Sequence, residues 1–368
     1  MAENRDDERR LVRIEDLRHC LVAAFERLEL PREDAAQVAE VLLDSELRGH
    51  ESHGVHLLGF LADAYRDGGM NPRPRIRVLR ETEEALLLDG DTNHVVGAVR
   101  AMRWCIERAR ERKGMAVAGV RNSQLIVPGF YARMAAADGL IGFVCANAVP
   151  MVAPPGGRTP TLGTNPFAYA IPAGRYPPVV LDVATTTGAA FRVRLAAQRN
   201  LPVPEGMILD GEGRPTTDPN EFIRGGLMAP LGSPAAPHKG FGLGLLFDTL
   251  AGVLTGAAFA RNFPSEPATA GNAFLWALDV EAFLPREEFL RWMEAQIDQV
   301  KSGERLAGVD ELFLPGERSH RRYHKLTTRG TAPLSGATWE VLTKACASLS
   351  IPPPVLAAEP RRTDSGST

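Results

Sequence analysis

Arg48-Gly49-His50-Glu51-Ser52-His53-Gly54 closes one predicted helix and opens another. This turn brings together a cation, a hydroxyl group and an imidazole, and its glycines allow the backbone to change direction sharply. Arg48 is suited to hold a carboxylate through two parallel hydrogen bonds, a geometry that lysine does not offer. His53 is suited to exchange a proton near neutral pH, with Ser52 as its orienting neighbour or relay. The turn therefore predicts acid–base chemistry on a carboxylate.

Plainer interpretations of these residues stay open. An arginine that follows a helix is often a solvated helix end or part of a surface ion pair, and a single histidine is often only a hydrogen-bonded structural group. His50, His53 and His56 with Glu51 also allow for a metal site. A zinc-binding helix needs H-E-x-x-H to place both imidazoles on one face, whereas this sequence reads H-E-S-H. We therefore expect no metal here.

The region around this turn has the pattern of a helical unit. Apolar residues at helical spacing predict a helix over residues 14–28. Pro31-Arg-Glu-Asp then starts a second helix with proline and acidic residues in the first turn. A third helix is predicted over residues 57–65. The first 70 residues or so are therefore expected to be helical and to present Arg48 and His53 at a helix junction.

Strands and helices alternate after this unit. Strands are predicted over residues 85–89, 115–120, 141–147, 167–171 and 179–183, and helices over residues 95–112, 130–138 and 286–301. This alternation predicts a mixed α/β sheet. Residues 199–237 are rich in Pro, Gly, Thr and Asp, which predicts a long functional loop. The most apolar run, residues 241–259, contains Asp248 and several glycines, so it predicts a buried helix and not a charge-free membrane span.

Composition limits the class of protein. The 368 residues are 44% hydrophobic and 24% charged with a formal net charge of −3, which gives no basic field for nucleic acid or anionic lipid. The charged N-terminus has no apolar core and so is not expected to be a signal peptide. Four scattered cysteines without a C-x-x-C pair argue against a disulfide framework or a zinc site. We expect a soluble, cytoplasmic protein with a small-molecule substrate and no nucleic-acid or membrane partner.

An ordinary dinucleotide-binding domain is not expected. Such a domain shows G-x-G-x-x-G between a strand and a helix. Gly240-Phe-Gly242-Leu-Gly244 imitates that spacing, but it follows Pro237-His238-Lys239, which reads as a loop. We interpret these glycines as sites of close helix packing.

Several blocks of the sequence resemble one known family. Arg48-Gly-His-Glu-Ser-His-Gly-Val55 is similar to the R-G-x-x-S-H-G-V signature of the malate/L-lactate dehydrogenase family, which includes ureidoglycolate and sulfolactate dehydrogenases and cyclic imino acid reductases. The resemblance runs in register from about residue 12 to 320, through Leu162-Gly-Thr-Asn-Pro166, Leu181-Asp-Val-Ala-Thr185, Pro204-Glu-Gly206, Thr216-Thr-Asp-Pro219 and Lys239-Gly-Phe-Gly-Leu243. It implies an α/β fold with a mixed sheet, a non-Rossmann NAD(P)-binding domain and a helical N-terminal unit.

The resemblance also implies a cofactor, a site and an assembly. The cofactor would be NAD or NADP, and the protein a homodimer. The catalytic residues would be His53, Ser52 and Arg48, and the cofactor site would use Asp182, Val183, Ala184, Lys239, Ser123 and Gln124. The substrate would meet Arg48, Thr164, Asn165, Leu125 and Phe191. Singly, these residues have structural alternatives: Asp182 as a strand end, Asn165-Pro166 as a turn and Lys239 as a residue before a helix.

The predicted domains follow from the composition and apolar periodicity of the chain together with this resemblance. Residues 1–11 are expected to be disordered, 12–120 to form a helical N-terminal unit with the first strands on the substrate side, 121–285 to form a cofactor-binding α/β domain, 286–350 to pack back as a C-terminal segment, and 351–368 to be a disordered tail.

Two motifs depart from the family pattern. Many members carry N-S-N-H-F-G where this chain has Asn122-Ser-Gln-Leu-Ile-Val-Pro-Gly129, so an imidazole is lost. Imino acid reductases carry H-G-D where this chain has Ala190-Phe191-Arg192, so a histidine and an aspartate are missing. An arginine near His53 would lower the pKa of that imidazole.

Two functions remain in view. The preferred one is an NAD(P)-dependent oxidoreductase that transfers hydride at the carbon next to a carboxylate, in a 2-oxo or 2-hydroxy acid or a cyclic imino acid, with a substrate bulkier and less polar than malate. His53 would exchange the proton, a contribution of typically 10²–10⁴-fold. The alternative is a divergent member that has lost ordinary dehydrogenase activity and does other chemistry or acts as a binding protein.

Overall fold

The computed structural model describes residues 9–263 and 271–357. The described parts of Met1–Asp63 and Arg321–Thr368 form one compact unit, called here the terminal unit. Ala64–His320 form the other, the central unit.

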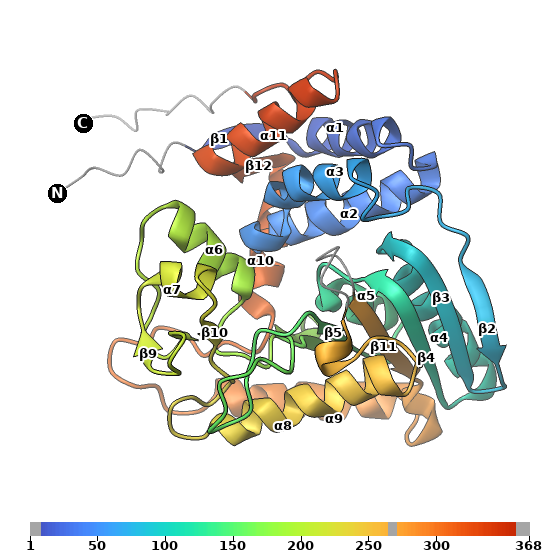
Figure 1. Ribbon diagram of the computed structural model, residues 1–368. Coiled ribbons are helices and arrows are strands. Elements are labelled where there is room, and N and C mark those ends of the chain that lie inside the picture. Colours follow the sequence, from blue (N-terminus) through green and yellow to red (C-terminus); the bar gives the residue numbers. More distant parts are fainter. Residues whose placement is uncertain (1–8, 264–270, 358–368) are drawn as a thin grey trace, which may run out of the picture. The chain divides into compact units, whose positions relative to one another are not determined.

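The terminal unit combines helices from both ends of the described chain (Figure 1). Helix α1 packs against α2 and α11, and buries the apolar stripe that its spacing predicted. The helices, some of which extend past the unit's limits, are α1 (Ile14–Arg27), α2 (Arg32–Arg48), η2 (Glu51–His53), η3 (Val55–Leu57), α3 (Leu58–Arg66), α10 (Glu317–Arg329) and α11 (Gly336–Ser348).

Residues 10 and 11, expected to be disordered, instead belong to a strand of a small sheet. Strand β1 (Arg10–Arg13) pairs antiparallel with β12 (Thr331–Leu334). Leu356, expected in a disordered tail, forms a bridge with Val12, and the N–H of Ala357 donates to the Leu11 carbonyl at 2.7 Å. The rest of the expected disorder, residues 1–8 and 358–368, lies outside the described residues.

The central unit is built on a seven-stranded mixed sheet, which confirms the expected fold class (Figure 1). Among the described strands of this sheet, only β3 and β4 are parallel neighbours, and the other pairs are antiparallel, unlike a doubly wound dinucleotide fold. The strand order is β2 (Arg77–Glu81), β3 (Ala85–His94), β4 (Met115–Gln124), β11 (Gly271–Leu278), β5 (Ile141–Ala148), β6 (Phe167–Ile171) and β7 (Val179–Val183).

The expected domain limits do not coincide with these units. The limit at residue 120 falls inside β4, and β11 lies between β4 and β5, so the two expected domains share one sheet. The expected C-terminal segment is also divided, because α9 (Arg286–Lys301) belongs to the central unit and α11 to the terminal unit.

Helices cover both faces of the seven-stranded sheet. A Cβ at Gly142 would meet Ala132 and Ala135 of α5 (Pro128–Ala137), so even-numbered positions of β5 face α5. Phe143 points the other way, with its ring centroid 6.0 Å from that of Phe247 in α8 (Pro237–Asp248). Helix α4 (Val96–Arg112) covers β3 and β4. Side chains alternate between the two faces of the sheet along each strand, and because helices cover both faces, apolar side chains are buried on both.

The long loop expected over residues 199–237 is instead a small layer of its own. It holds a three-stranded sheet in the order β10 (Leu227–Met228), β8 (Ile208–Leu209) and β9 (Pro215–Thr216), with helix α7 (Pro219–Ile223). Helix α6 (Ala190–Gln198) packs on α7. Met207, Ile208 and Met228 share a hydrophobic cluster with Val193 of α6.

The expectation of a buried helix after residue 241 is wrong. Leu245, Leu246 and Leu254 are 51%, 50% and 62% exposed, so α8 and the turn after it present an apolar face. In the part of the chain that the structure describes, no helix has the length and apolar composition of a membrane span.

Candidate functional site

The turn that carries the predicted catalytic residues lies at the C-terminal end of α2. Gly49 ends α2 with φ of +88°, a left-handed conformation that favours glycine. The N–H of Gly49 donates to the Glu46 carbonyl, and that of His50 donates to Ser45. The two short 3-10 helices η2 and η3 then follow, with Ser52 and His53 in the first of them.

Ser52 and His53 form a pair within this turn. Ser52 Oγ lies 2.9 Å from His53 Nδ1. In the tautomer with hydrogen on Nδ1, His53 donates to Ser52 and its Nε2 is the proton acceptor. Burial, and to a lesser extent the charge of His50, lower the pKa of His53 to about 4, so this imidazole is neutral at pH 7. His50 is in the terminal unit, and Arg192, from which lowering was expected, is not among the causes.

Glu46 fixes the far side of the turn and was not identified from the sequence. Its side chain is buried, and Oε2 accepts a hydrogen bond from the N–H of Val55 at 3.1 Å. A Cβ at Gly54 would lie 2.5 Å from that oxygen, so the turn packs directly on Glu46. Burial, then Glu51, raises the pKa of Glu46 to about 7. The sequence feature that could have drawn attention to Glu46 is the run of three polar residues Asp44-Ser-Glu46. These residues lie on a helix segment that is buried throughout.

Arg48 is held by two neighbours and is not a solvated helix end. Its Nε lies 2.8 Å from Asp44 Oδ1, and the side chains of Arg48 and Asp44 are 11% and 8% exposed. The guanidinium carbon lies 4.3 Å from the centre of the Tyr323 ring in α10. The contact of Arg48 with Asp44 could be predicted from the sequence, because the two residues are four apart on one helix. The contact with Tyr323 could not, because only the fold brings α10 to α2.

In the central unit, hydrogen bonds join three segments that carry expected cofactor or substrate residues. Asp182 and Val183 end β7 and Ala184 follows. The N–H and the hydroxyl of Thr185 both donate to the Thr164 carbonyl, at 2.9 and 3.0 Å. The Leu231 N–H donates to the Thr185 carbonyl, and the Leu231 carbonyl accepts from Gly240 next to Lys239. The structure therefore brings the end of β7, Thr164 and the first turn of α8 together.

Two expected site residues in this region are engaged within the protein. The carboxylate of Asp182 accepts a hydrogen bond from the Gly129 N–H at 2.8 Å, at the N-terminus of α5. Asn165 is completely buried, and its amide donates to the Gly244 carbonyl at 2.9 Å and accepts from the Ala148 N–H at 3.2 Å. Asn165 therefore fixes the loop that carries Thr164, where a substrate contact was expected.

The segment that replaces N-S-N-H-F-G starts inside β4. The strand runs to Gln124, and Ser123 and Leu125 are buried, with exposures of 1% and 3%. Gln124 Oε1 lies 2.8 Å from Nε2 of His94 on the parallel neighbour β3. His94 is fully buried, which lowers its pKa to about 4. An imidazole therefore lies beside this segment, from a position 30 residues earlier in the chain.

His94 was missed because strand β3 was predicted to end at residue 89, before it. The three residues Ala190-Phe191-Arg192 begin α6 and are not a loop. Phe191 is 36% exposed on this helix, whereas Val193 is buried beneath it.

The glycines near Lys239 have different roles. A Cβ at Gly240 would lie 2.3 Å from the Leu231 nitrogen, and one at Gly244 would lie 3.1 Å from Thr185 Oγ1, which confirms close packing at both. At Gly242 nothing lies within 4 Å, so the packing interpretation is wrong there. Lys239 is exposed in the first turn of α8, where the positive end of the helix adds to its charge. That combination fits a phosphate group of a dinucleotide.

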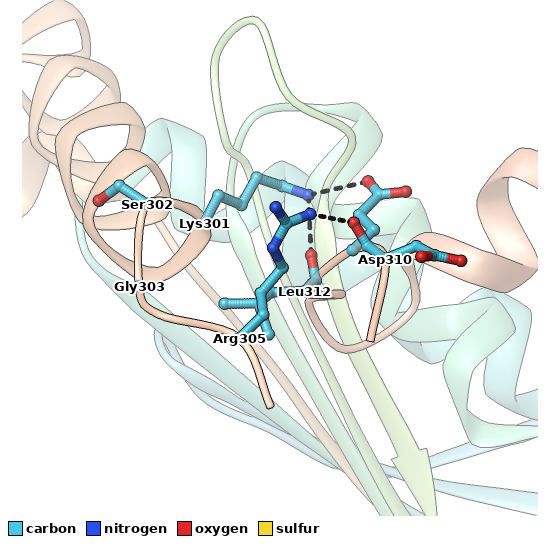
Figure 2. A pocket seen from close by; sticks show the side chains of 7 residues that line it. Lys301, Ser302, Gly303, Arg305, Asp310 and Leu312 are labelled. Atoms are coloured by element: carbon cyan, nitrogen blue, oxygen red, sulfur yellow. Dashed lines mark hydrogen bonds and ion pairs between the residues drawn. The ribbon is translucent and has the colours of Figure 1, made fainter. Parts of the chain in front are cut away.

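A pocket of about 360 Å³ lies at the end of α9 (Figure 2). Lys301 Nζ lies 2.9 and 2.8 Å from the two carboxylate oxygens of Glu317, and Arg305 donates to the Asp310 carbonyl. None of the predicted site residues lines this pocket. Among the described residues, no group of three His, Cys, Asp or Glu side chains is placed to hold a metal ion.

Comparison with known proteins places the chain in a family. Residues 12–343 match the family described as malate/L-lactate dehydrogenase. The chain is 36% identical over 306 residues to the malate dehydrogenase of Pyrococcus abyssi, covering 81% of this chain and 84% of that protein. It is 37% identical over 299 residues to the L-sulfolactate dehydrogenase of Methanothermobacter thermautotrophicus, covering 79% and 83%.

The fold matches as well. The structure of malate dehydrogenase from Pyrococcus horikoshii OT3 superposes with a TM-score of 0.86 and 31% identity, covering 95% of this chain and 99% of that one. Dehydrogenases of this family use NAD(P), which confirms the cofactor class expected. The chain belongs to the malate/L-lactate dehydrogenase family of oxidoreductases.

Proposed function

We propose that this protein is an NAD(P)-dependent dehydrogenase of 2-hydroxy acids in which Arg48 holds the substrate carboxylate and His53 exchanges the proton. The observation that carries this proposal is the Ser52–His53 pair at 2.9 Å, in a turn fixed by Glu46 and next to an arginine oriented by Asp44. Preorganised groups of this kind need no rearrangement when the substrate binds.

The charge state of His53 favours oxidation at neutral pH. With a pKa of about 4 in the unliganded protein, the imidazole is neutral and can accept the proton of a substrate hydroxyl group. Ser52 stabilises the resulting imidazolium by its contact with Nδ1. A substrate carboxylate held beside His53 would raise the pKa of the imidazole, which makes the reverse proton transfer accessible.

NAD or NADP supplies hydride transfer chemistry when it is bound. The residues proposed to hold it are Asp182, Val183, Ala184, Ser123, Gln124 and Lys239. Lys239 is the best supported of these, because it is exposed at the positive end of a helix. Ser123 is the least supported, because it is buried against Gly97 of α4.

The substrate is proposed to be bulkier and less polar than malate. Loss of the H-G-D triplet at Ala190-Phe191-Arg192 removes an acid and an imidazole and adds an aromatic ring. Phe191 is the better candidate for contact with the substrate because it is 36% exposed, whereas Leu125 is buried. Thr164, held by Thr185, completes the proposed substrate contacts.

A panel of substrates tests this proposal. The purified protein is assayed with NAD⁺ and NADP⁺ on malate, sulfolactate, lactate and phenyllactate, and with NADH and NADPH on a cyclic imino acid. We expect turnover of at least one 2-hydroxy acid, highest for phenyllactate, and loss of turnover in His53→Ala with an unchanged melting temperature. No turnover, together with no shift in melting temperature at millimolar NADH or NADPH, would exclude the proposal.

The alternative of a divergent member predicts a different result in the same assay. Leu125 stands where the family histidine is lost. If NADH or NADPH raises the melting temperature but none of the substrates is turned over, the protein has kept the cofactor site and has lost dehydrogenase activity toward these acids.

The active form is proposed to be a homodimer in the cytoplasm. Its contact surface would include the leucines of α8, Leu245 and Leu246, because about half of each side chain is exposed and exposed apolar faces often mark contacts with a partner. Light scattering should give twice the chain mass for the wild type and one chain mass for Leu245→Glu/Leu246→Glu. Leu306→Glu, at a leucine that is 82% exposed outside α8, is the matched control and should remain a dimer.

A further inference from the structure

Two cysteines that are far apart in the sequence lie in contact in the terminal unit. Cys20 is on α1 and Cys346 is on α11, 326 residues later, and their sulfur atoms are 3.4 Å apart. Both side chains are buried, with exposures of 6% and 0%. Disulfide formation would require the two sulfurs to approach by a further ~1.4 Å, to the usual bond length of about 2.05 Å.

The environment of this pair differs from that of the other two cysteines. The two sulfur atoms share a hydrogen bond, which lowers the pKa of Cys346 and raises that of Cys20. Cys105 on α4 and Cys145 on β5 belong to the central unit, and burial raises the pKa of both thiols. Because the thiolate is the reactive form of cysteine, Cys346 is the favoured nucleophile of the four.

We infer that Cys20 and Cys346 are a site of disulfide formation that joins the first and last helices of the terminal unit. With a peroxide as oxidant, the Cys346 thiolate attacks one oxygen, the O–O bond breaks, and a sulfenic acid and hydroxide form. The Cys20 sulfur then attacks the sulfenic sulfur, the S–O bond breaks, and the sulfenic hydroxyl group leaves with the Cys20 thiol proton as water. The peroxide is reduced by two electrons, and the two sulfurs are oxidised by the same number.

The position of the bond predicts its effect. The segment after Cys346 turns back at Ile351, passes Pro352, whose carbonyl lies 3.8 Å from the Cys20 sulfur, and reaches the bridge between Leu356 and Val12. A bond between α1 and α11 would therefore fix the helices that carry both strands of the small sheet. The bond would also close a very long loop in the unfolded chain, and closing such a loop removes much of the conformational freedom of that chain.

Peptide mapping tests this inference independently of any catalytic activity. The reduced protein is treated with hydrogen peroxide, and in parallel with diamide, then alkylated and digested without reductant. We expect a cross-linked pair of peptides that contain Cys20 and Cys346, and a rise in melting temperature of at least ~3 °C that dithiothreitol reverses.

The variants provide matched controls. Cys346→Ala should lose both the cross-link and the reversible rise in melting temperature, whereas Cys105→Ala should keep both. A substitution at a buried position can itself impair folding. The peptide map of the wild-type protein is therefore the result that tests the inference. Absence of the cross-link with both oxidants, or a cross-link that involves Cys105 or Cys145 instead, would overturn the inference.

Discussion

The carboxylate of Glu46 accepts a hydrogen bond from the backbone N–H of Val55, across the turn that contains Ser52 and His53. The carbonyl of the same residue accepts from Gly49 at the start of that turn. One buried residue of α2 is therefore bonded to both ends of the segment on which the proposed proton transfer depends.

Glu46→Ala is expected to loosen this turn. It removes the acceptor of a buried N–H, which should lower the free energy of unfolding by about 1–3 kcal/mol. Displacement of His53 should lower kcat/KM at least about tenfold. Glu46→Gln keeps an oxygen acceptor and should restore most of both quantities. If Ala and Gln at this position give equal activity, the hydrogen bond does not position His53.

Glu46→Gln should also change how stability depends on pH. Burial raises the folded-state pKa of Glu46 to about 7 from an ordinary 4.5, so only the folded protein keeps the proton between these values. The wild type should therefore lose stability relative to the variant by about 1.4 kcal/mol per unit as pH rises from 4.5 to 7. Urea titrations at several pH values measure this difference. Glu33→Gln, at an exposed position of the same helix, should show no such trend.

Arg48→Lys is expected to weaken substrate binding although the charge is kept. Lysine cannot reproduce the planar group that is held by Asp44 and lies on the Tyr323 ring. KM for the acid substrate should rise about ten- to hundred-fold, with a smaller change in kcat. Tyr323→Leu should raise KM a few-fold by removing the ring, and Tyr323→Phe should not. Equal effects of Leu and Phe would show that the ring does not orient Arg48.

The pH profile of oxidation should reflect the low pKa of His53. Its value of about 4, against an ordinary 6.5, predicts that kcat/KM stays level from pH 7.5 to about 5.5. With a histidine base of ordinary pKa, kcat/KM would fall about tenfold over the same pH range. His50→Gln removes one of the two causes and should move the acid limb upward, but not to 6.5, because burial remains. A limb near 6.5 in the wild type would contradict this assignment.

His94 should make the protein sensitive to acid. Its pKa of about 4 in the folded state lies below the ordinary 6.5, so unfolding takes up a proton as the pH falls between these values. The wild type should lose stability relative to His94→Gln by about 1.4 kcal/mol per unit from pH 6.5 to 4. His238→Gln, at an exposed histidine, is the control and should follow the wild type. Glu46 changes the stability in the opposite direction with pH. The effect of each residue is therefore measured as the difference in stability between the wild type and the variant at that residue.

Local patterns in the sequence predicted the regular elements well. The helices expected over residues 14–28 and 286–301 agree with α1 and α9 to within a residue at each end. These helices have clear apolar periodicity, proline near the N-terminus or acidic residues in the first turn. Strands β6 and β7 were also predicted with their observed limits, because continuous apolar runs mark strands in a covered sheet.

Features that depend on distant residues were missed. Strands β8, β9 and β10 have two residues each, too few to show a period, and are stabilised by partners across a turn. His94 meets Gln124 only because β3 and β4 are parallel neighbours. Tyr323 reaches Arg48 only through the packing of the terminal unit. The residue types and the family resemblance pointed to Arg48, Ser52 and His53 as the proposed catalytic residues, but the hydrogen bond by which Glu46 fixes their turn is visible only in the fold.

The pairing of β1 with β12 has a consequence for how the chain reaches this structure. The N-terminal helices emerge from the ribosome first, yet the strand and helix that complete their unit are made only after residue 330. The proposed catalytic turn therefore belongs to a part of the protein that cannot finish folding until β12 and α11 have been made. The central sheet is free to form earlier, whereas the apolar stripe of α1 is covered completely only when α11 packs on it.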